Sequence, residues 1–422
     1  MKEKIAFVVV RYGKDINGGA EYHCQMLAER LIGEYDVEVL TTCVRNVSTG
    51  DNYYAEGIEN WNGVVIRRFK ADPVNPQSER TYTKRAKPAR RLRRLLYQLR
   101  LLKFISVFFP VWNFKQEDEI NAMNASMFYS SGLNSFIQCH KDDYKAFVAM
   151  SLDYPTFYYT ALYAGEKMIA IPTMHYAKIS FRSLLTLAIS KVAYVGFNTG
   201  EEQKLGERIF GKAMKSCGII SVGIETPEAA NWEEVKIKFQ LPEKYLLYVG
   251  RITHVKLYHL LSYFLNYKKK YVDSTLKLVL VGGITIDKVV DPDIIYTGFV
   301  SDEEKMSILQ HAEIVVNPSN GESLSLILLE AMNQGKPMLV NGCCKVLKEH
   351  CLKSDFASFY YKNGRKFNHY LHKMENSAEL HKQMAVKGRK YVADNYNWKH
   401  IMKRMNAAID LVGRKENKRY NS

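Results

Sequence analysis

The sequence predicts an α/β protein of two domains, each built around a mostly parallel β-sheet. Its 422 residues exceed what a single hydrophobic core usually serves, which predicts two domains. Short continuous apolar runs alternate with segments of helical periodicity, as expected for strands buried between layers of helices. One such unit spans residues 312–340, where a strand, a serine-rich loop, a helix ending before Gly335 and a second strand follow each other.

The first domain is expected over residues 1–218. It opens with a strand at residues 5–10, a glycine-bearing loop, and a helix at about residues 21–31 whose apolar residues recur every three or four positions. Residues 72–118 do not fit the alternation of strands and helices and are interpreted as an inserted basic and aromatic arm. The remaining strands are predicted at residues 37–41, 64–69, 146–150, 168–173 and 192–197.

The second domain is expected over residues 219–396, after a hinge-like turn marked by Gly223 and Pro227. Ser301 is predicted to cap a helix at residues 302–311. The tail, residues 397–422, begins with a further helical pattern. The strands of this domain are predicted at residues 245–249, 276–281, 294–297, 314–316 and 338–340.

The composition is that of a globular protein, with 47% hydrophobic and 25% charged residues. No apolar run approaches the roughly 20 residues that a membrane-spanning helix needs. The seven cysteines are scattered, which indicates a reducing compartment. No P-loop or Ser-His-Asp pattern is evident, and Asp291-Pro292-Asp293 is interpreted as a turn. No metal site is expected, because the spacing of one close group matches no common zinc pattern: Cys343, Cys344, His350 and Cys351.

The most informative segment is the loop and helix at residues 321–332. Glu322 lies in the loop and Glu330 eight positions later in the helix. In parallel sheets, ligands bind at the loops that follow the strands, and the free N–H groups of a helix start suit a diphosphate. Two carboxylates beside such a site suit the hydroxyls of a sugar or ribose. The N–H groups concerned are those near Ser323, Leu324 and Ser325.

Two cations follow the strand at residues 245–249. Arg251 and Lys256 can clamp a diphosphate and neutralise it as it departs. The alternative is a solvated pair at a helix start, where cations oppose the helix dipole unless an anion is bound.

These segments resemble the retaining glycosyltransferases of GT-B type, family 4. The matching features are the Glu-x7-Glu pair, the Arg251 to Lys256 spacing, and Gly18-Gly19-Ala20-Glu21. The resemblance covers nearly the whole chain and looks closest to bacterial enzymes of surface-polysaccharide assembly, in which a run like Asn341–Leu347 follows the helix. It implies two Rossmann-like domains facing a central cleft, with a C-terminal helix that crosses back to the first domain.

The resemblance also implies roles for residues of the second domain. Arg251 and Lys256 would stabilise the leaving group, Glu322 would contact the donor sugar, and Glu330 would hold the ribose. The turn at Gly298 and Phe299 would receive the base through backbone groups. The chain departs from the family where Leu257 replaces a glycine and where Ser323 and Leu324 replace a glycine and an aromatic residue.

In the first domain, Gly18 and Gly19 would let the backbone approach the donor closely. A Gly-Gly loop alone is usually only a flexible turn. His175 resembles the histidine that faces the donor sugar in the family, although a lone histidine is more often structural, and Tyr176 stands where the family often has Asp. Asp153 is a further candidate.

The function that the resemblance implies is sugar transfer from a nucleotide donor, UDP- or GDP-linked, without a metal. The acceptor hydroxyl would be deprotonated by the departing phosphate, with retention at the anomeric carbon. The expected acceptor is a lipid-linked bacterial surface glycan, such as lipopolysaccharide, O-antigen, capsule or exopolysaccharide. Two alternatives stay open: a soluble transferase with a small acceptor, and a non-catalytic nucleotide-sugar-binding scaffold.

The net charge of +16 is concentrated in one segment, because residues 80–103 contain ten basic residues and no acidic one. A leucine stripe (Leu92, Leu95, Leu96 and Leu99) is expected opposite a basic side with Arg90, Arg93, Arg94 and Arg100, and aromatic residues follow at Phe104, Phe108, Phe109 and Trp112. Residues 80–112 therefore suit an anionic membrane surface, which places the protein in the cytoplasm, on the inner face of the membrane. The alternative is a solvated helix whose leucines pack on the domain. No nucleic-acid-binding motif accompanies the charge.

Overall fold

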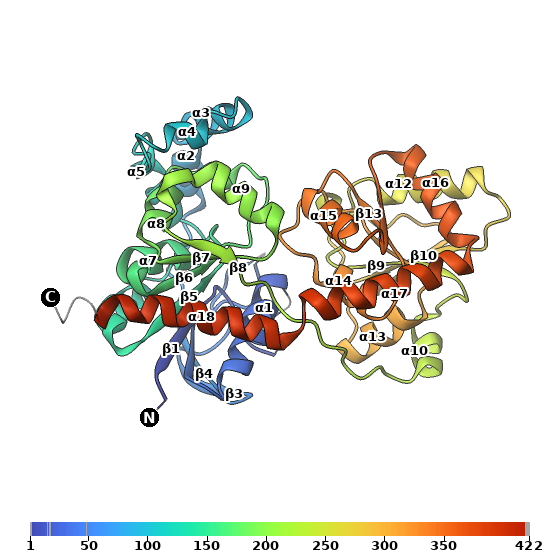
Figure 1. The fold of residues 1–422 in the computed structure, drawn as a ribbon, viewed down its shortest axis with the longest axis horizontal. Coiled ribbons are helices and arrows are strands. Elements are labelled where there is room, and N and C mark those ends of the chain that lie inside the picture. Colours follow the sequence, from blue (N-terminus) through green and yellow to red (C-terminus); the bar gives the residue numbers. More distant parts are fainter. Residues whose placement is uncertain (1, 15, 17, 48, 418–422) are drawn as a thin grey trace. The chain divides into compact units, whose positions relative to one another are not determined.

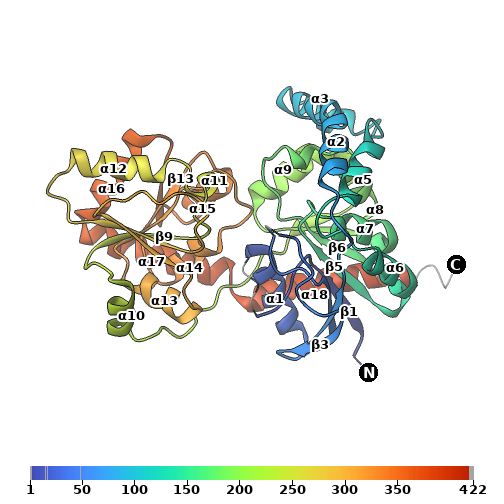
Figure 2. The same ribbon diagram turned by 180° about the vertical axis from the view of Figure 1, so that it is seen from behind.

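The structure is a computed structural model that describes residues 2–14, 16, 18–47 and 49–417. The chain forms two compact units, of which the first comprises Met1–Val222 and the residues from Ile401 onward, and the second comprises Gly223–His400. Each unit contains one β-sheet with helices on both sides (Figures 1 and 2). The predicted α/β architecture with two Rossmann-like sheets is confirmed.

The sheet of the first unit has eight strands in the order β3-β4-β2-β1-β5-β6-β7-β8. All neighbours pair in parallel except the edge strand β3, which is antiparallel to β4. The strands are β1 (Lys4–Val8), β2 (Asp36–Thr42), β3 (Gly57–Trp61), β4 (Val64–Phe69), β5 (Ala146–Met150), β6 (Met168–Ile171), β7 (Tyr194–Phe197) and β8 (Cys217–Ile219).

The helices of the first unit lie between these strands, and α18 (Trp398–Asn417) joins them from the end of the chain. The α-helices are α1 (Gly19–Leu31), α2 (Pro76–Arg85), α3 (Lys87–Gln98), α4 (Leu102–Ile105), α5 (Gln116–Asn124), α6 (Ser131–His140), α7 (Pro155–Ala164), α8 (Leu184–Lys191) and α9 (Gly200–Phe210). Short 3₁₀ turns are η1 (Lys141–Asp143), η2 (Gly165–Lys167), η3 (Ile179–Phe181) and η4 (Gly211–Ala213).

The second unit has a six-stranded, entirely parallel sheet in the order β11-β10-β9-β12-β13-β14. The strands are β9 (Tyr245–Val249), β10 (Lys277–Val281), β11 (Ile294–Gly298), β12 (Ile314–Asn317), β13 (Met338–Asn341) and β14 (Ser358–Tyr361). The helices are α10 (Trp232–Phe239), α11 (His254–Leu257), α12 (Leu260–Lys270), α13 (Asp302–His311), α14 (Leu326–Asn333), α15 (Lys345–Lys353), α16 (Gly364–Glu375) and α17 (Ala378–Asn395).

Local sequence explains where these elements begin and end. Ser301 caps α13, and Glu304 completes a capping box by accepting a hydrogen bond from the Ser301 N–H, so the predicted cap is confirmed. After α14 the chain turns at Gly335, which has a φ of +70°, and the N–H of Lys336 donates to the carbonyl of Ala331.

The basic segment forms helices α2, α3 and α4, which lie together at the top of the first unit in both views (Figures 1 and 2). The side chains of Leu92 and Leu95 on α3, and of Leu99 directly after it, are exposed. Phe104, Phe108 and Phe109 are each about two-thirds exposed, at 65%, 66% and 67%. The alternative in which the leucine stripe packs on the domain is therefore wrong for these three leucines; Leu96 alone packs against the core.

Two members of this segment pack inward, contrary to their predicted place on the surface; Arg93 is buried and Trp112 is half-buried. Arg93 is fully buried and donates to three backbone carbonyls, those of Phe181, Arg182 and Ile209. Burial lowers the pKa of Arg93 to about 10, which still leaves it charged at neutral pH. Trp112 packs against the hydrophobic core, and its backbone N–H donates to Thr186 Oγ1. No helix of the described residues is long and apolar enough to cross a bilayer.

Candidate functional site

The order of strands in the second unit indicates where a ligand binds. Strand β9, the first of this sheet, lies in the middle, with β10 on one side and β12 on the other. The chain therefore reverses direction across the sheet between β9 and β12, and ligands of open parallel sheets bind at the carboxyl ends of the strands at such a point. The loops in question follow Val249 and Asn317, and they carry Arg251, Lys256 and Glu322.

Lys256 and Glu322 come together across this switch point. Lys256 Nζ lies 2.7 Å from Glu322 Oε1, and both side chains are partly exposed. The side chain of Thr253 caps the short helix α11 by accepting a hydrogen bond from the backbone N–H of Lys256 at 3.1 Å. This bond holds the backbone of Lys256 in place. Leu257, the departure from the family pattern, points into the core and is buried. The two predicted residues thus form one ion pair.

Arg251 lies on the same loop with an exposed side chain. Its carbonyl accepts a hydrogen bond of 2.8 Å from the hydroxyl of the buried Tyr248. Burial raises the pKa of Tyr248, the charge of Glu322 raises it further, and the charge of Arg251 opposes both. Both charged groups therefore lie near Tyr248, so Arg251, Lys256 and Glu322 share one region at the ends of β9 and β12.

The loop that leads into α14 is held in an unusual conformation. Ser325 has a φ of +88°, a backbone state that costs a non-glycine residue about 1–3 kcal/mol. Asn317 Nδ2 donates to Ser325 Oγ at 3.0 Å, and Asn317 Oδ1 accepts from the N–H of Ser319. No side chain caps α14; the N–H groups of Leu328 and Leu329 donate to the carbonyl of Ser325 at the start of the helix. Such strain at a helix start is typical of ligand-binding loops.

A buried histidine braces the same loop. His350 Nε2 lies 3.0 Å from the carbonyl oxygen of Leu324, and His350 Nδ1 lies 3.0 Å from the hydroxyl of Tyr391. Burial lowers the pKa of His350 to about 4, so the ring is neutral at pH 7. A neutral ring with these neighbours donates from Nε2 to the carbonyl and accepts at Nδ1 from the tyrosine hydroxyl. Sequence reasoning had considered His350 only as a zinc ligand.

Glu330 lies on α14 and is 8% exposed. Its Oε1 is 3.3 Å from Nζ of Lys305, which comes from α13 and lies 3.2 Å from Asp302. A buried carboxylate needs such a partner. No sequence pattern indicated that Lys305 would pair with Glu330, because it is one basic residue in an ordinary helix.

Gly298 and Phe299 lie at the end of β11, two strands away from β9. The N–H of Gly282 donates to the carbonyl of Gly298 at 2.8 Å, and the N–H of Gly250 donates to Val281 at 2.9 Å, so the ends of the three strands are held together. Gly282 has a φ of +133°, and a Cβ on it would overlap the carbonyl oxygen of Gly250. Phe299 is 70% exposed and its ring lies against Gly283.

In the first unit, Gly18 and Gly19 have different surroundings. A Cβ on Gly18 would overlap the carboxylate of Glu21, which forms a buried ion pair with Arg11. Glycine is therefore needed at position 18 to avoid Glu21, whether or not a ligand binds there. Gly19 is exposed, and a Cβ there would meet nothing within 4 Å, so only Gly19 leaves open space beside the backbone.

His175 and Asp153 lie on the loops after β6 and β5, neighbouring strands of the first sheet. Burial raises the pKa of Asp153, and the charges of Arg182 and His175 oppose this rise, so the three side chains are close. Thr173 has a φ of +46°, its Oγ1 lies 3.0 Å from Ser151 Oγ, and Glu202 Oε1 accepts from the N–H of Met174 at 2.6 Å. The loop that carries His175 is thus fixed from two sides.

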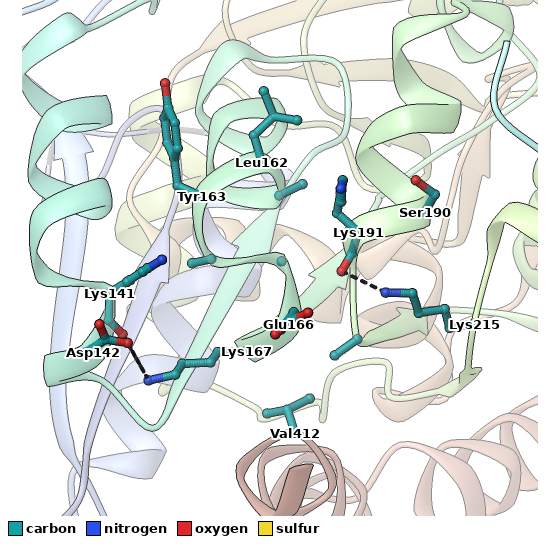
Figure 3. A pocket seen from close by; sticks show the side chains of 14 residues that line it. Lys141, Asp142, Leu162, Tyr163, Glu166, Lys167, Ser190, Lys191, Lys215 and Val412 are labelled. Carbon is teal, nitrogen blue, oxygen red and sulfur yellow. Dashed lines mark hydrogen bonds and ion pairs between the residues drawn. The ribbon is translucent and has the colours of Figure 1, made fainter. Parts of the chain in front are cut away.

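A cavity of the first unit lies near the starts of strands β5 to β8 (Figure 3). It has a volume of about 840 Å³, and its lining residues Lys141, Glu166, Lys191 and Lys215 each precede a strand. Lys167 Nζ lies 3.4 Å from Asp142 Oδ1, and Lys215 Nζ lies 3.4 Å from the carbonyl of Lys191 (Figure 3). None of the predicted site residues contributes to it.

Cys343, Cys344, His350 and Cys351 do not gather into a ligand set. Within the described part of the chain, no three His, Cys, Asp or Glu side chains are placed to hold a metal ion. Cys344 and Cys351 are buried, and burial raises the pKa of both thiols.

Comparison with known proteins finds one family model that matches most of the second unit. Residues 232–391 match the family model described as Glycosyl transferases group 1. An uncharacterized glycosyltransferase of Methanocaldococcus jannaschii is 23% identical over 97% of this chain and 100% of its own length. The matched segment contains Arg251, Lys256, Glu322 and Glu330.

Solved structures share the fold of the whole chain. Sucrose-phosphate synthase from Thermosynechococcus elongatus superposes with a TM-score of 0.66 at 14% identity, covering 96% of this chain and 98% of its own. HepE from Anabaena, solved with UDP and glucose, gives 0.65 at 12% identity, covering 97% and 99%. WaaG, a glycosyltransferase involved in lipopolysaccharide biosynthesis, gives 0.61 at 12% identity, covering 97% and 99%. The chain therefore has the GT-B fold, and residues 232–391 match the group 1 glycosyl transferase model.

Proposed function

We propose that this protein is a retaining glycosyltransferase of family 4 that moves a sugar from a nucleotide donor to a lipid-linked surface glycan. The observation that carries the proposal is the Lys256–Glu322 pair at the switch point between β9 and β12, inside the group 1 domain. A cation beside a carboxylate at this point matches the two needs of a nucleotide sugar, a charged diphosphate and a hydroxylated ring.

The donor would use residues of the second unit in distinct roles. Arg251 and Lys256 would bind the diphosphate, together with the N–H groups of Ser323, Leu324 and Ser325. Glu322 would accept hydrogen bonds from the donor sugar and Glu330 from the ribose, with Gly298 and Phe299 beside the base. Because Lys256 and Glu322 already touch, each holds the other in place before the donor arrives. The UDP bound to HepE supports a nucleotide donor.

The reaction would proceed on one face of the sugar. The bond between the anomeric carbon and the diphosphate oxygen breaks, and the acceptor oxygen bonds to the same face of that carbon. The acceptor proton passes to the departing diphosphate oxygen. Arg251, Lys256 and the helix N–H groups stabilise the negative charge that develops on the diphosphate, which is the step that the enzyme accelerates. His175 would face the donor sugar from the first unit, with Gly18 and Gly19 near the phosphates.

A lipid-linked acceptor is supported by the exposed apolar face of α3 and α4. Leu92, Leu95, Leu99 and three phenylalanines lie in the solvent beside a cluster of cations. Anionic leaflets attract each nearby cation by about 1 kcal/mol, and apolar side chains then insert shallowly. The protein would thus act at the inner face of the membrane. WaaG has the same fold and is involved in lipopolysaccharide biosynthesis.

A donor screen tests the proposal. The purified chain is incubated with a panel of UDP- and GDP-sugars, and release of the nucleotide is measured with Lys256→Ala as the comparison. We expect release from one donor class by the wild type and far less by the variant. Proton NMR of the glycoside formed should show the anomeric configuration of the donor. Nucleotide binding without any release would favour a non-catalytic scaffold, and an inverted product would contradict the retaining assignment.

A further inference from the structure

A second cavity of the first unit is lined almost entirely by cations. It has a volume of about 600 Å³ and lies between α2, α3 and the loop around η3. The remaining lining residues are Thr83 and Ile179, and no carboxylate contributes. We call it the cation pocket; its charged members are Lys87, Arg90, Arg91, Arg94, Lys178 and Arg182. α3, which supplies four of them, lies at the top of the first unit in Figures 1 and 2.

The pocket holds more positive charge than the protein itself compensates. Among the described residues, no carboxylate lies within ion-pair distance of Lys87, Arg91, Lys178 or Arg182. Burial lowers the pKa of Arg90 and of Arg182, as expected where charged groups leave water. Holding like charges together in a partly dry cavity costs free energy, which an anionic ligand would recover.

Three carboxylates near the pocket act on Arg182, those of Asp153, Glu119 and Glu79. Glu119 of α5 is buried. Its Oε2 accepts from the N–H of Leu184 at 3.0 Å, while Oε1 has no hydrogen-bond partner in the described structure. Burial raises the pKa of Glu119, and the charges of Arg182, Arg90 and Arg93 oppose the rise. Three carboxylates near the pocket face its six cations, so an excess of positive charge remains.

The walls of the pocket are fixed by hydrogen bonds that do not use the exposed cations. Arg93 Nη1 donates to the carbonyl of Arg182 at 2.6 Å, and Arg93 Nη2 donates to Ile209 at 3.1 Å, which ties α3 to the η3 loop. Arg90 Nη2 donates to the carbonyl of Thr83 at 2.6 Å, which ties α3 to α2. The spacing of the cations is therefore built into the fold, as a preformed anion site requires.

Arg182 links the pocket to the candidate acceptor side of the site. Its charge acts on Asp153, as does that of His175, so the inner end of the pocket lies beside these two residues. Leu92 and Leu95 of the same helix α3, and Leu99 directly after it, are exposed to solvent. A ligand held here thus has the loops after β5 and β6 near one end and the exposed apolar face of α3 nearby.

From this arrangement we infer that the cation pocket binds a phosphate or diphosphate group of the acceptor. The inference rests on the proposed function, since it assigns a chemical feature to the substrate of that reaction. Guanidinium groups bind phosphate oxygens in pairs, and several cations favour a diphosphate over a single carboxylate. The group can come from a lipid diphosphate or from a soluble sugar phosphate; the apolar neighbours on α3 make the lipid the first source to test.

Calorimetric titration with inorganic pyrophosphate tests the site. The variants are Arg182→Gln and the exposed pair Lys87→Gln with Arg91→Gln; Lys103→Gln removes a charge from the same segment outside the pocket. We expect the affinity to fall at least about tenfold in both pocket variants and to stay unchanged in Lys103→Gln. Because pyrophosphate also suits the donor loop, Lys256→Ala is measured alongside. Binding that falls in Lys256→Ala but not in the pocket variants would overturn the inference.

Two further arms identify the source of the phosphate. Neutral phosphatidylcholine vesicles containing an isoprenoid diphosphate are compared with the same vesicles without it, and a hexose 6-phosphate is titrated separately. Capture by the diphosphate vesicles that pyrophosphate displaces would assign the lipid, and competition by the hexose phosphate would assign a soluble acceptor. If neither ligand competes with pyrophosphate, the acceptor role is wrong. The proposed function stands or falls separately, on nucleotide release in the donor screen.

Discussion

At the scale of single residues, Lys256 and Glu330 have different roles in the proposed donor site, where Lys256 Nζ lies 2.7 Å from Glu322 Oε1. Lys256 lies where negative charge would develop as the glycosidic bond breaks. Glu330 lies on α14 and forms an ion pair with Lys305 of α13. Their substitutions should therefore affect different steps.

We expect Lys256→Ala to slow transfer about 10²- to 10³-fold with a small change in donor affinity, because its charge is needed most in the transition state. Glu330→Ala should weaken donor binding about tenfold, because the ribose loses its acceptor. Calorimetry and turnover measurements distinguish the two effects, and Lys382→Ala, an exposed lysine of α17, is the control. Wild-type affinity and rate in either variant would remove that residue from the site.

The positive charge of Arg251 and Lys256 also bears on the need for a metal ion. Since two side chains and the start of α14 can neutralise a diphosphate, we expect nucleotide release to continue after treatment with a chelator. The measurement is turnover before and after EDTA, with dialysis into metal-free buffer. Activity that disappears with EDTA and returns with Mg²⁺ or Mn²⁺ would contradict this expectation.

Residue pairs show how far sequence reasoning reaches. Glu322 and Lys256 were recognisable because each lies at a characteristic distance from a strand and a glycine. The Lys305–Glu330 pair depends on the packing of α13 beside α14, and the burial of Arg93 depends on carbonyls about 90 to 116 residues away in the chain. Neither contact leaves a local pattern, because a lysine or arginine on a helix ordinarily faces water.

At the scale of elements, continuous apolar runs fixed the strands well. Strands β4, β5 and β9 and helix α13 have the predicted bounds. The strands that the sequence did not reveal are β3, β8 and β14, all at or beside sheet edges. β3 is largely exposed and therefore lacks the apolar run that marks a buried strand. The predicted arm at residues 72–118 contains helices α2 to α5, and the first three of these form the basic segment.

The apolar face of α3 and α4 predicts a membrane contact that can be measured without touching the cation pocket. Phe108→Ser with Phe109→Ser should lower co-sedimentation with anionic vesicles about tenfold or more, because the variant lacks two exposed rings that would insert into the apolar part of the bilayer. Binding by the wild type should also fall as salt rises, since the charge term is screened. Arginine substitutions in this segment should spare Arg93, whose loss would leave three carbonyls without a donor.

The control for this experiment replaces exposed apolar side chains in a different part of the protein. Val272→Ser with Val290→Ser removes two exposed apolar residues of the second unit, 79% and 98% exposed. It should leave vesicle binding unchanged. Equal binding by the phenylalanine variant and the wild type would exclude a docking role for α3 and α4.

At the scale of the whole molecule, each unit contains one buried histidine among the residues that the structure describes. His23 Nε2 lies 3.1 Å from the carbonyl of Ser221 in the first unit, and His350 braces Leu324 in the second. Burial lowers both pKa values to about 4, whereas an unfolded chain takes up the proton near pH 6.5. Their contribution to stability is therefore complete above about pH 6.5 and is lost as the pH falls toward 4.

The free energy of unfolding should accordingly drop by about 2 kcal/mol for each histidine between neutral pH and about pH 5. Urea titrations at the two pH values check this. His23→Gln and His350→Gln should each flatten the pH dependence, and His369→Gln, an exposed histidine, should not. A wild-type protein equally stable at both values would contradict the assignment.

The path of the chain through the two units has a consequence for its synthesis. The second unit is one continuous segment, Gly223–His400, whereas the first needs residues from both ends of the sequence. Ile401, Met405, Ile409 and Val412 of α18 are all buried, and Asn406 Nδ2 donates to Glu34. A growing chain therefore begins the first unit early but cannot cover this part of its apolar surface until α18 leaves the ribosome. Of the two units, the one begun first is completed second, and the apolar surface left uncovered in the meantime is prone to aggregation.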